Sequence, residues 1–241
     1  MKTIFVTGGA KRIGKAIIEL FAQDNWRIII HYNKSASDAE ALAESINANN
    51  GDSAFVVKGD LDKSDDVQSI VSSVNSISET IDLLVNNAST FYPTPIEDIS
   101  NDHWDKLIGS NLKGPLFLIQ GLKEKLQASK GSIINITDTN LTKGIANYSI
   151  YSAAKAGLES ITKGLAKELA PEIKVNAISP GTMLEPPDVT WTEEQKNKVI
   201  ESIPLKRMGT EKDIAETVYF LAHSDYITGQ IIKVDGGRSL S

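Results

Sequence analysis

Tyr151 and Lys155 are the two side chains in this sequence that are best suited to acid–base chemistry. They stand four residues apart in YSIYSAAKAGLESITKGLAKEL, residues 148–169, whose apolar spacing predicts a helix. The two side chains therefore project from one helical face, one turn apart. An ammonium group beside a phenol lowers the phenol pKa from about 10, which would let Tyr151 exchange a proton with a substrate. By itself this spacing is also common on amphipathic helices that catalyse nothing.

A glycine-rich turn follows the first apolar run of the chain. The run TIFV, residues 3–6, leads into TGGAKRIG, residues 7–14. Gly8 permits a tight turn, Gly14 lets a helix pack close to the strand, and free N–H groups at the helix start attract phosphate. A doubly wound sheet binds the pyrophosphate of a nucleotide at this place. Arg12 is an unusually bulky cation for such a turn.

The residues after the second apolar run select the nucleotide. An NAD site usually has Asp or Glu here, which binds the ribose 2′-hydroxyl. The segment HYNKS, residues 31–35, has no acid, and Lys34, Ser35 and His31 can donate hydrogen bonds to a 2′-phosphate. We therefore expect NADP(H) as the cofactor, with Arg12 as a second cation nearby. The alternative is a solvated turn with one lysine.

Short β-branched runs alternate with helical patterns along the chain. Strands that are apolar on both faces and separated by helices indicate a parallel sheet covered on both sides. Because crossovers are right-handed, the sheet is doubly wound. We expect a single α/β, Rossmann-like domain over residues 1–241, with a further helix in EKDIAETVYFLA, residues 211–222. The seven expected strands lie at residues 3–6, 27–32, 53–57, 81–85, 132–136, 174–178 and 230–234.

Composition limits the classes of function. The 241 residues are 41% hydrophobic and 23% charged, as in ordinary globular proteins. A net charge of −6, without any block of Lys or Arg, predicts no nucleic-acid partner and a small-molecule substrate instead. No apolar run approaches the roughly 18 residues of a membrane span, and no signal peptide precedes the first strand, so we expect a cytoplasmic protein. Cysteine is absent and the histidines His31, His103 and His223 lie far apart, so we expect no metal.

The least regular part of the sequence is residues 181–204. It contains Pro186, Pro187 and many charged residues. We expect a loop that covers the substrate at the strand ends, with Met183 and Leu184 in contact with the substrate. The alternative is a surface insertion without such a role.

Taken together, these motifs resemble the short-chain dehydrogenase/reductases. The glycine turn is followed by NNAS at residues 86–89, SNLKG at 110–114, YSAAK at 151–155 and SPG at 179–181, in the order and spacing of that family over essentially the whole chain. The resemblance implies that Lys155 also holds the nicotinamide ribose. The implied cofactor contacts are Gly8, Lys11, Arg12, Ile13, Gly14, His31, Tyr32, Asn33, Lys34, Ser35, Asp60, Leu61, Asn87, Ala88, Ser89, Tyr151, Lys155, Pro180 and Gly181.

Two departures from the general family pattern point to a subgroup. The family has glycine at the position of Arg12 and serine 13 residues before Tyr151, where this chain has Asp138. With NNASTFYPTP, residues 86–95, these departures resemble the pteridine reductases and the bacterial dihydromonapterin reductases. The subgroup implies that Arg12 binds both pyrophosphate and substrate, and that Phe91 stacks on a pterin. The implied substrate contacts are Arg12, Ser89, Phe91, Asp138, Tyr151, Met183 and Leu184, and the implied catalytic residues are Asp138, Tyr151, Lys155 and Asn111.

The chemistry of these residues agrees with the implied roles. A flat pterin can lie between Phe91 and the nicotinamide, while Asp138 orients a ring amine and supplies protons. Two alternatives stay open: Phe91 could be a core aromatic, and Asp138 could cap a turn in NITDTN. Thr137 or Thr139 could supply the hydroxyl of the family serine, although neither has the 13-residue offset.

The sequence therefore predicts an NADPH-dependent reductase of a dihydropteridine, such as dihydrobiopterin, dihydromonapterin or dihydrofolate. The second hypothesis is a short-chain reductase of a carbonyl substrate, a 3-oxoacyl thioester or a quinone, which would use the same tyrosine and lysine. A third is a non-catalytic NADP-binding regulator. The family resemblance further implies a homo-oligomer, usually a tetramer.

Overall fold

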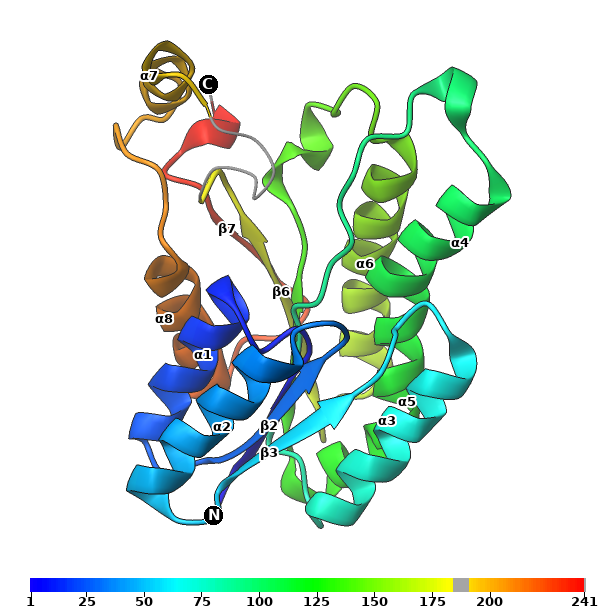
Figure 1. The fold of residues 1–241 in the computed structure, drawn as a ribbon, viewed down its shortest axis with the longest axis vertical. Coiled ribbons are helices and arrows are strands. Elements are labelled where there is room, and N and C mark those ends of the chain that lie inside the picture. The colour runs from blue at the N-terminus through cyan, green and yellow to red at the C-terminus, as the bar shows by residue number, and fades with distance from the viewer. Residues whose placement is uncertain (184–190, 241) are drawn as a thin grey trace.

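The computed structural model describes residues 1–183 and 191–240. Its centre is a parallel sheet (Figure 1). Within these residues the sheet has seven strands in the order β3-β2-β1-β4-β5-β6-β7, and every neighbouring pair is parallel. The predicted doubly wound fold is confirmed. The strands are β1 Thr3–Val6, β2 Arg27–Tyr32, β3 Ala54–Lys58, β4 Leu83–Asn86, β5 Ser132–Ile136, β6 Lys174–Pro180 and β7 Ile231–Val234.

Helices cover both faces of the sheet. Helices α1, α2 and α8 lie on one face, and α3, α5 and α6 lie on the other (Figure 1). The α-helices are α1 Arg12–Gln23, α2 Ala36–Asn50, α3 Ser64–Ile77, α4 Asn101–Ile108, α5 Gly114–Ser129, α6 Ser149–Glu168, α7 Glu193–Glu201 and α8 Glu211–Ala222. Short helical turns are η1 Ile96–Asp98, η2 Gly109–Lys113, η3 Thr139–Thr142 and η4 Arg238–Leu240.

Strand β1 illustrates why the sheet is buried on both sides. Ile4 and Val6 pack into the core under α1 and α8, whereas Phe5 between them packs into the core under α3 and α5. All three side chains are fully buried. Alternate residues of a strand point to opposite faces, and burial of each such side chain stabilises the fold by roughly 1.5–3 kcal/mol. The unbroken apolar runs in the sequence follow from this arrangement.

The motifs meet because all strands end at the same edge. The strand order reverses between β1 and β4, which is where open α/β sheets bind ligands. The glycine turn follows β1, the NNAS motif follows β4, and Asp138 follows β5. Strand β6 continues to Pro180, two residues beyond the predicted strand end, so most of the SPG motif belongs to the strand itself.

Part of the segment expected as a loop at residues 181–204 is helical. Helix α7 begins with a capping box: the Thr192 hydroxyl accepts from the Gln195 N–H at 3.2 Å, and the Gln195 side chain accepts from the Thr192 N–H at 2.9 Å. This reciprocal cap overrides the irregular composition of the segment. Leu184 lies outside the described residues. Among the described helices, none combines the length and apolar character that a bilayer span requires.

The close packing of α1 on the glycine turn yields a stability prediction. A Cβ on Gly14 would lie 2.2 Å from the carbonyl oxygen of Gly8 and 2.9 Å from Cα of Gly9, and both are backbone atoms. We expect Gly14→Ala to lower the free energy of unfolding by more than about 2 kcal/mol, measured by urea denaturation. Gly164→Ala, exposed on α6 with no atom within 4 Å of the new Cβ, is the control and should not destabilise. Equal stability of the two variants would contradict the proposed packing.

Candidate active site

Tyr151 and Asp138 meet at the edge of the sheet. Tyr151 lies in the first turn of α6 and is 5% exposed, and its hydroxyl donates a hydrogen bond to Oδ2 of Asp138 at 3.0 Å. Asp138 follows β5 and immediately precedes η3. The segment from Asp138 to Tyr151 therefore runs from a strand end through a loop to the start of a helix, and it brings these two side chains together.

The two oxygens of the Asp138 carboxylate have different partners. Oδ1 caps η3 by accepting hydrogen bonds from the N–H of Asn140 at 2.8 Å and from its side-chain Nδ2 at 2.9 Å. Oδ2 faces Tyr151. The turn-cap interpretation thus holds for Oδ1, whereas Oδ2 is directed to Tyr151 and the catalytic role of Asp138 stays a prediction. The Thr137 hydroxyl lies 3.0 Å from Oε1 of Glu159 and 3.2 Å from the carbonyl oxygen of Ile178, and the Thr139 hydroxyl donates to the Pro180 carbonyl at 3.2 Å, so neither hydroxyl takes the place of the family serine.

Lys155 lies one helical turn beyond Tyr151 and is almost completely buried. Its Nζ donates to the carbonyl of Ile136 at 2.8 Å and lies 6.0 Å from the centre of the Tyr151 ring. Burial lowers the Lys155 pKa to about 8, and the negative charge of Asp138 opposes this shift only in part. Lys155 therefore changes charge just above neutral pH.

The pKa of Tyr151 is raised, not lowered as the sequence suggested. Burial is the main cause, followed by the charge of Asp138 and the hydrogen bond to it, while Ser89 acts weakly in the opposite direction. The expectation was wrong because it considered the lysine one turn away but neither the burial of the phenol nor the carboxylate that faces the hydroxyl. Tyr151 consequently keeps its proton at neutral pH and is ready to donate it.

A buried chain of polar side chains docks α6 onto the sheet. Asn86 at the end of β4 donates to Oδ1 of Asn135 on β5 at 2.8 Å, and Asn135 donates to the Thr162 hydroxyl on α6 at 2.9 Å. All three side chains are buried. Leaving one of these groups unpaired would cost about 1–3 kcal/mol, so the chain restricts how α6 can shift along the sheet. Because Tyr151 and Lys155 lie on α6, this hydrogen-bonded chain also fixes their positions.

Asn111 supports the segment after β4. It is fully buried in η2, a turn of π-helix, where Oδ1 accepts from the Ser89 hydroxyl at 2.8 Å and Nδ2 donates to the carbonyls of Thr90 at 2.9 Å and Leu107 at 3.0 Å. These bonds hold Ser89 and its neighbours at the sheet edge. The catalytic role implied for Asn111 stays a prediction.

Phe91 is not a core aromatic and lies beside Tyr151. Its ring is 48% exposed, stacks on Tyr148 with centroids 4.4 Å apart, and meets the edge of Tyr151 at 4.8 Å. Tyr148 was not among the predicted site residues, although its position one helical turn before Tyr151 in YSIYS could have indicated it. The three rings form an aromatic wall beside the Tyr151 hydroxyl.

The glycine turn fits a nucleotide phosphate. Helix α1 starts without a side-chain cap and without an acidic residue in its first turn, so its N–H groups can meet an anion. Asn87 donates to the carbonyls of Thr7 at 2.9 Å and Gly8 at 3.1 Å and thereby braces the turn. Arg12 is exposed and has a left-handed φ of 50°, which costs a non-glycine residue free energy and is frequent at functional sites.

His31 does not bind the 2′-phosphate, which corrects the sequence-based expectation. It is 1% exposed, its Nδ1 accepts from the Gly8 N–H at 3.1 Å, and its Nε2 pairs with the carbonyl of Gly59 at 3.1 Å. Burial lowers its pKa to about 4, so the ring is neutral and both nitrogens are occupied. His31 instead ties the glycine turn after β1 to the loop after β3.

Two exposed lysines, Lys34 and Lys11, lie around the expected 2′-phosphate position, together with one acid, Asp38, that was not predicted. Lys34 and Asn33 are exposed after β2, and Ser35 precedes α2. Lys11 forms a salt bridge of 2.9 Å with Asp38 in the first turn of α2, an acid that lies just beyond HYNKS and that the sequence reasoning did not weigh. Asp38 therefore competes with any anion for Lys11.

Several other predicted contacts are core residues by their side chains. Tyr32 and Met183 pack in the core near α8, and Leu61 packs in the core on the opposite face. Met183 fills the space beside Gly209, because a Cβ added to Gly209 would come within 2.6 Å of the Met183 side chain. This packing corrects the assignment of Met183 as a substrate contact.

Asp60 lies at the sheet edge. Burial raises the Asp60 pKa, but hydrogen bonds from Asp62 and Asn33 outweigh this effect and keep the pKa below its usual value. The remaining predicted residues at this edge are Ile13, Ala88, Pro180 and Gly181.

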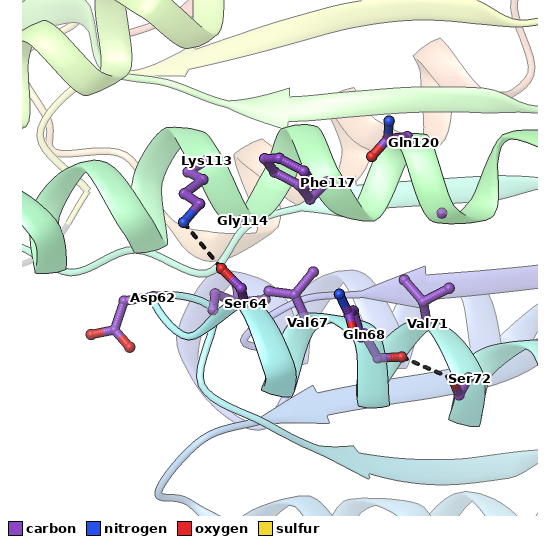
Figure 2. A pocket seen from close by; sticks show the side chains of 12 residues that line it. Asp62, Ser64, Val67, Gln68, Val71, Ser72, Lys113, Gly114, Phe117 and Gln120 are labelled. Atoms are coloured by element: carbon purple, nitrogen blue, oxygen red, sulfur yellow. Dashed lines mark hydrogen bonds between the residues drawn. The ribbon is translucent and has the colours of Figure 1, made fainter.

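A separate cavity of about 470 Å³ lies between α3 and α5 (Figure 2). Val67 and Val71 of α3 face Phe117 of α5 across it, and Lys113 donates to the Ser64 hydroxyl at its rim at 3.1 Å. It contains none of the residues predicted to be catalytic. The chemistry described above therefore belongs to the strand ends and not to this cavity.

A doubly wound parallel sheet with an uncapped glycine turn at its switch point and a buried tyrosine–lysine pair beside it defines an NAD(P)-dependent oxidoreductase. The family described as Enoyl-(Acyl carrier protein) reductase matches residues 8–239. The chain belongs to the short-chain dehydrogenase/reductase family.

Similar proteins cover almost the whole chain. A 3-oxoacyl-acyl-carrier-protein reductase FabG of Staphylococcus epidermidis is 36% identical over 240 residues, covering 98% of each protein. The corresponding reductase of Staphylococcus aureus is 35% identical, covering 98% of this chain and 97% of the relative. Pteridine reductase 1 of Leishmania tarentolae is 32% identical over 279 aligned positions, covering 98% of this chain and 96% of the relative.

The lowered pKa of Lys155 predicts how stability depends on pH. Between about pH 8 and pH 10 the unfolded chain keeps the Lys155 proton while the folded protein releases it, so the wild type gains stability as pH rises. Lys155→Met lacks this proton. The difference in free energy of unfolding, wild type minus variant, should rise by up to about 1.4 kcal/mol per pH unit in this range. A difference that does not change with pH would contradict burial of the ammonium group.

The Lys11–Asp38 pair predicts a change in coenzyme affinity. We expect NADPH to bind at least tenfold more tightly than NADH, about 1.4 kcal/mol. Asp38→Asn should strengthen NADPH binding about two- to fivefold, because Lys11 is released and a nearby negative charge is removed, and should leave NADH binding unchanged. Glu19→Gln, which removes a comparable pair with Lys15 on α1, is the control. Calorimetric titration of the wild type and the two variants with each coenzyme measures all six affinities, and equal gains for both coenzymes in Asp38→Asn would exclude a 2′-phosphate effect.

Proposed function

We propose that this protein is an NADPH-dependent reductase whose substrate is a dihydropteridine. The observation that carries the proposal is the 3.0 Å hydrogen bond from the Tyr151 hydroxyl to the carboxylate of Asp138. The general family pattern has a serine at this position. A serine hydroxyl can donate to a substrate carbonyl, whereas an ionised carboxylate only accepts hydrogen bonds. Asp138 therefore suits a substrate that presents N–H groups.

The residues around Tyr151 support the same substrate class. Phe91 and Tyr148 provide an exposed aromatic wall that a flat heteroaromatic ring can stack on. Arg12 extends an additional donor group near the expected phosphate position, from a backbone conformation that a glycine would adopt more easily. An extended acyl chain has no flat ring that could stack on these two side chains.

The chain holds and moves the proton of the reaction. The glycine turn, Lys155 and the residues around Lys34 would hold NADPH, which would supply the hydride to a ring carbon. The raised pKa of Tyr151 keeps its hydroxyl protonated until the adjacent ring nitrogen becomes basic enough to take the proton. Asp138 is half-buried and can collect a proton from solvent and return it to Tyr151. The ammonium group of Lys155 offsets the negative charge that develops at the phenol.

Whole-chain similarity favours a second candidate. Identity to the two 3-oxoacyl-acyl-carrier-protein reductases, 36% and 35%, exceeds the 32% identity to the pteridine reductase. A short-chain reductase of a 3-oxoacyl thioester would use the same Tyr151 and Lys155. We prefer the pterin proposal because Asp138, Phe91 and Arg12 lie at the site itself, whereas overall identity is dominated by residues that build the fold.

The proposal includes three expectations about the protein as a whole. We propose that it acts in the cytoplasm, that it forms a homo-oligomer, and that NADP(H) is its only cofactor. The family resemblance supports a tetramer, which sedimentation analysis of the purified protein would test.

Substitution of Tyr151 and of Asp138 tests the proposed roles of these two hydrogen-bonded residues. With dihydrobiopterin, Tyr151→Phe should reduce kcat about 10²- to 10⁴-fold, because the proton donor is lost while the ring remains. Asp138→Ser should also reduce pterin turnover strongly and leave NADPH affinity nearly unchanged. Initial rates of NADPH oxidation measure both effects.

The same variants assayed with an acetoacetyl thioester provide the comparison. A carbonyl reductase would retain or gain activity in Asp138→Ser, since serine restores the general family residue. It would also tolerate Phe91→Ala, which in a pterin reductase should raise the apparent KM because stacking acts in the ground state as well. That pattern of results would replace the pterin proposal by the carbonyl one.

A further inference from the structure

Asn140 stands next to the reacting groups but has no role in the function proposed above. It lies in η3, half-buried, two residues after Asp138. Its backbone N–H and its side-chain Nδ2 both donate to Oδ1 of Asp138, at 2.8 Å and 2.9 Å. Among the described residues, Asn140 thus supplies two hydrogen bonds to this one oxygen.

A carboxylate needs such restraint to face a fixed partner. The terminal torsion of an aspartate is broad and roughly two-fold, so rotation of the group is inexpensive. With one oxygen held by two donors from one side, the other oxygen is directed toward Tyr151 at 3.0 Å. The backbone donor would remain in any variant at position 140, whereas the Nδ2 donor requires the amide side chain.

The turn that carries Asn140 is itself anchored to the sheet. The Thr139 hydroxyl donates to the carbonyl of Pro180 at the end of β6 at 3.2 Å. The carbonyl of Asn140 accepts from the N–H groups of Lys143 at 3.1 Å and Gly144 at 2.9 Å. Asn140 is therefore held in place from both sides and can hold Asp138 in turn.

We propose that Asn140 is a positioning residue that holds the Asp138 carboxylate in the orientation that meets Tyr151. It touches neither the proton nor the hydride, and it acts only through Asp138. The inference rests on the proposed function in one respect, which is that the Asp138 to Tyr151 contact takes part in the reaction. The orientation of the carboxylate is a matter of geometry and can be tested without it.

The kinetic test compares Asn140 variants with the wild type on dihydrobiopterin. Asn140→Ala should lower kcat about tenfold or more, because a small misplacement of a reacting group is costly, and should leave the KM for NADPH unchanged. Asn140→Asp places a like charge beside Asp138 and should lower kcat further. Asn140→Ser, which retains a short donor, should recover part of the loss. Asn101→Ala, at an exposed asparagine at the start of α4, is the control and should behave as wild type.

A crystal structure of Asn140→Ala distinguishes failure of this inference from failure of the proposed function. We expect the Asp138 carboxylate to turn and its 3.0 Å contact with the Tyr151 hydroxyl to be lost. An unchanged contact together with an unchanged kcat would overturn the positioning role. If the wild type reduces neither dihydrobiopterin nor an acetoacetyl thioester, the proposed function fails, and the contact distance alone decides about Asn140.

Discussion

The hydrogen bond between the Tyr151 hydroxyl and the Asp138 carboxylate is the interaction on which the rest of the site depends. It joins the segment after β5 to the start of α6, and it adds to the effect of burial, the larger cause, in raising the phenol pKa. A carboxylate beside a phenol opposes loss of the phenol proton, so Tyr151 rests in the protonated form from which a general acid acts. Reduction, with a proton delivered as the hydride arrives, is the direction that this arrangement supports.

Lys155 complements that pair at a cost to stability. Its ammonium group is buried among strand and helix atoms and has only the Ile136 carbonyl as a hydrogen-bond acceptor in the described structure. Burial of a charge with so little compensation is unfavourable, which is why its pKa falls to about 8. The buried chain of Asn86, Asn135 and Thr162 holds α6 against the sheet and keeps the lysine in this position.

The nucleotide half of the site follows a similar logic. His31 fixes the glycine turn through Gly8 and the loop after β3 through Gly59, and it can do so because burial keeps the ring neutral. Arg12 adopts a left-handed conformation in the same turn. One buried residue thus supports the turn, and one exposed residue extends from it.

The order of strands and helices was determined by the sequence alone, because apolar runs buried on both faces and helical periodicity are local properties. Helix α8 matches its prediction at both ends, and the motifs after β1, β4 and β5 meet because parallel strands end at one edge. Which side chain faces which partner was decided only by the tertiary structure. In HYNKS, His31 was predicted to bind phosphate, but its side chain is buried beneath the glycine turn. Lys155 was predicted to lower the Tyr151 pKa, but burial and the Asp138 carboxylate opposite the hydroxyl raise it. Burial and charge act through space, and residues that are distant in the chain set both.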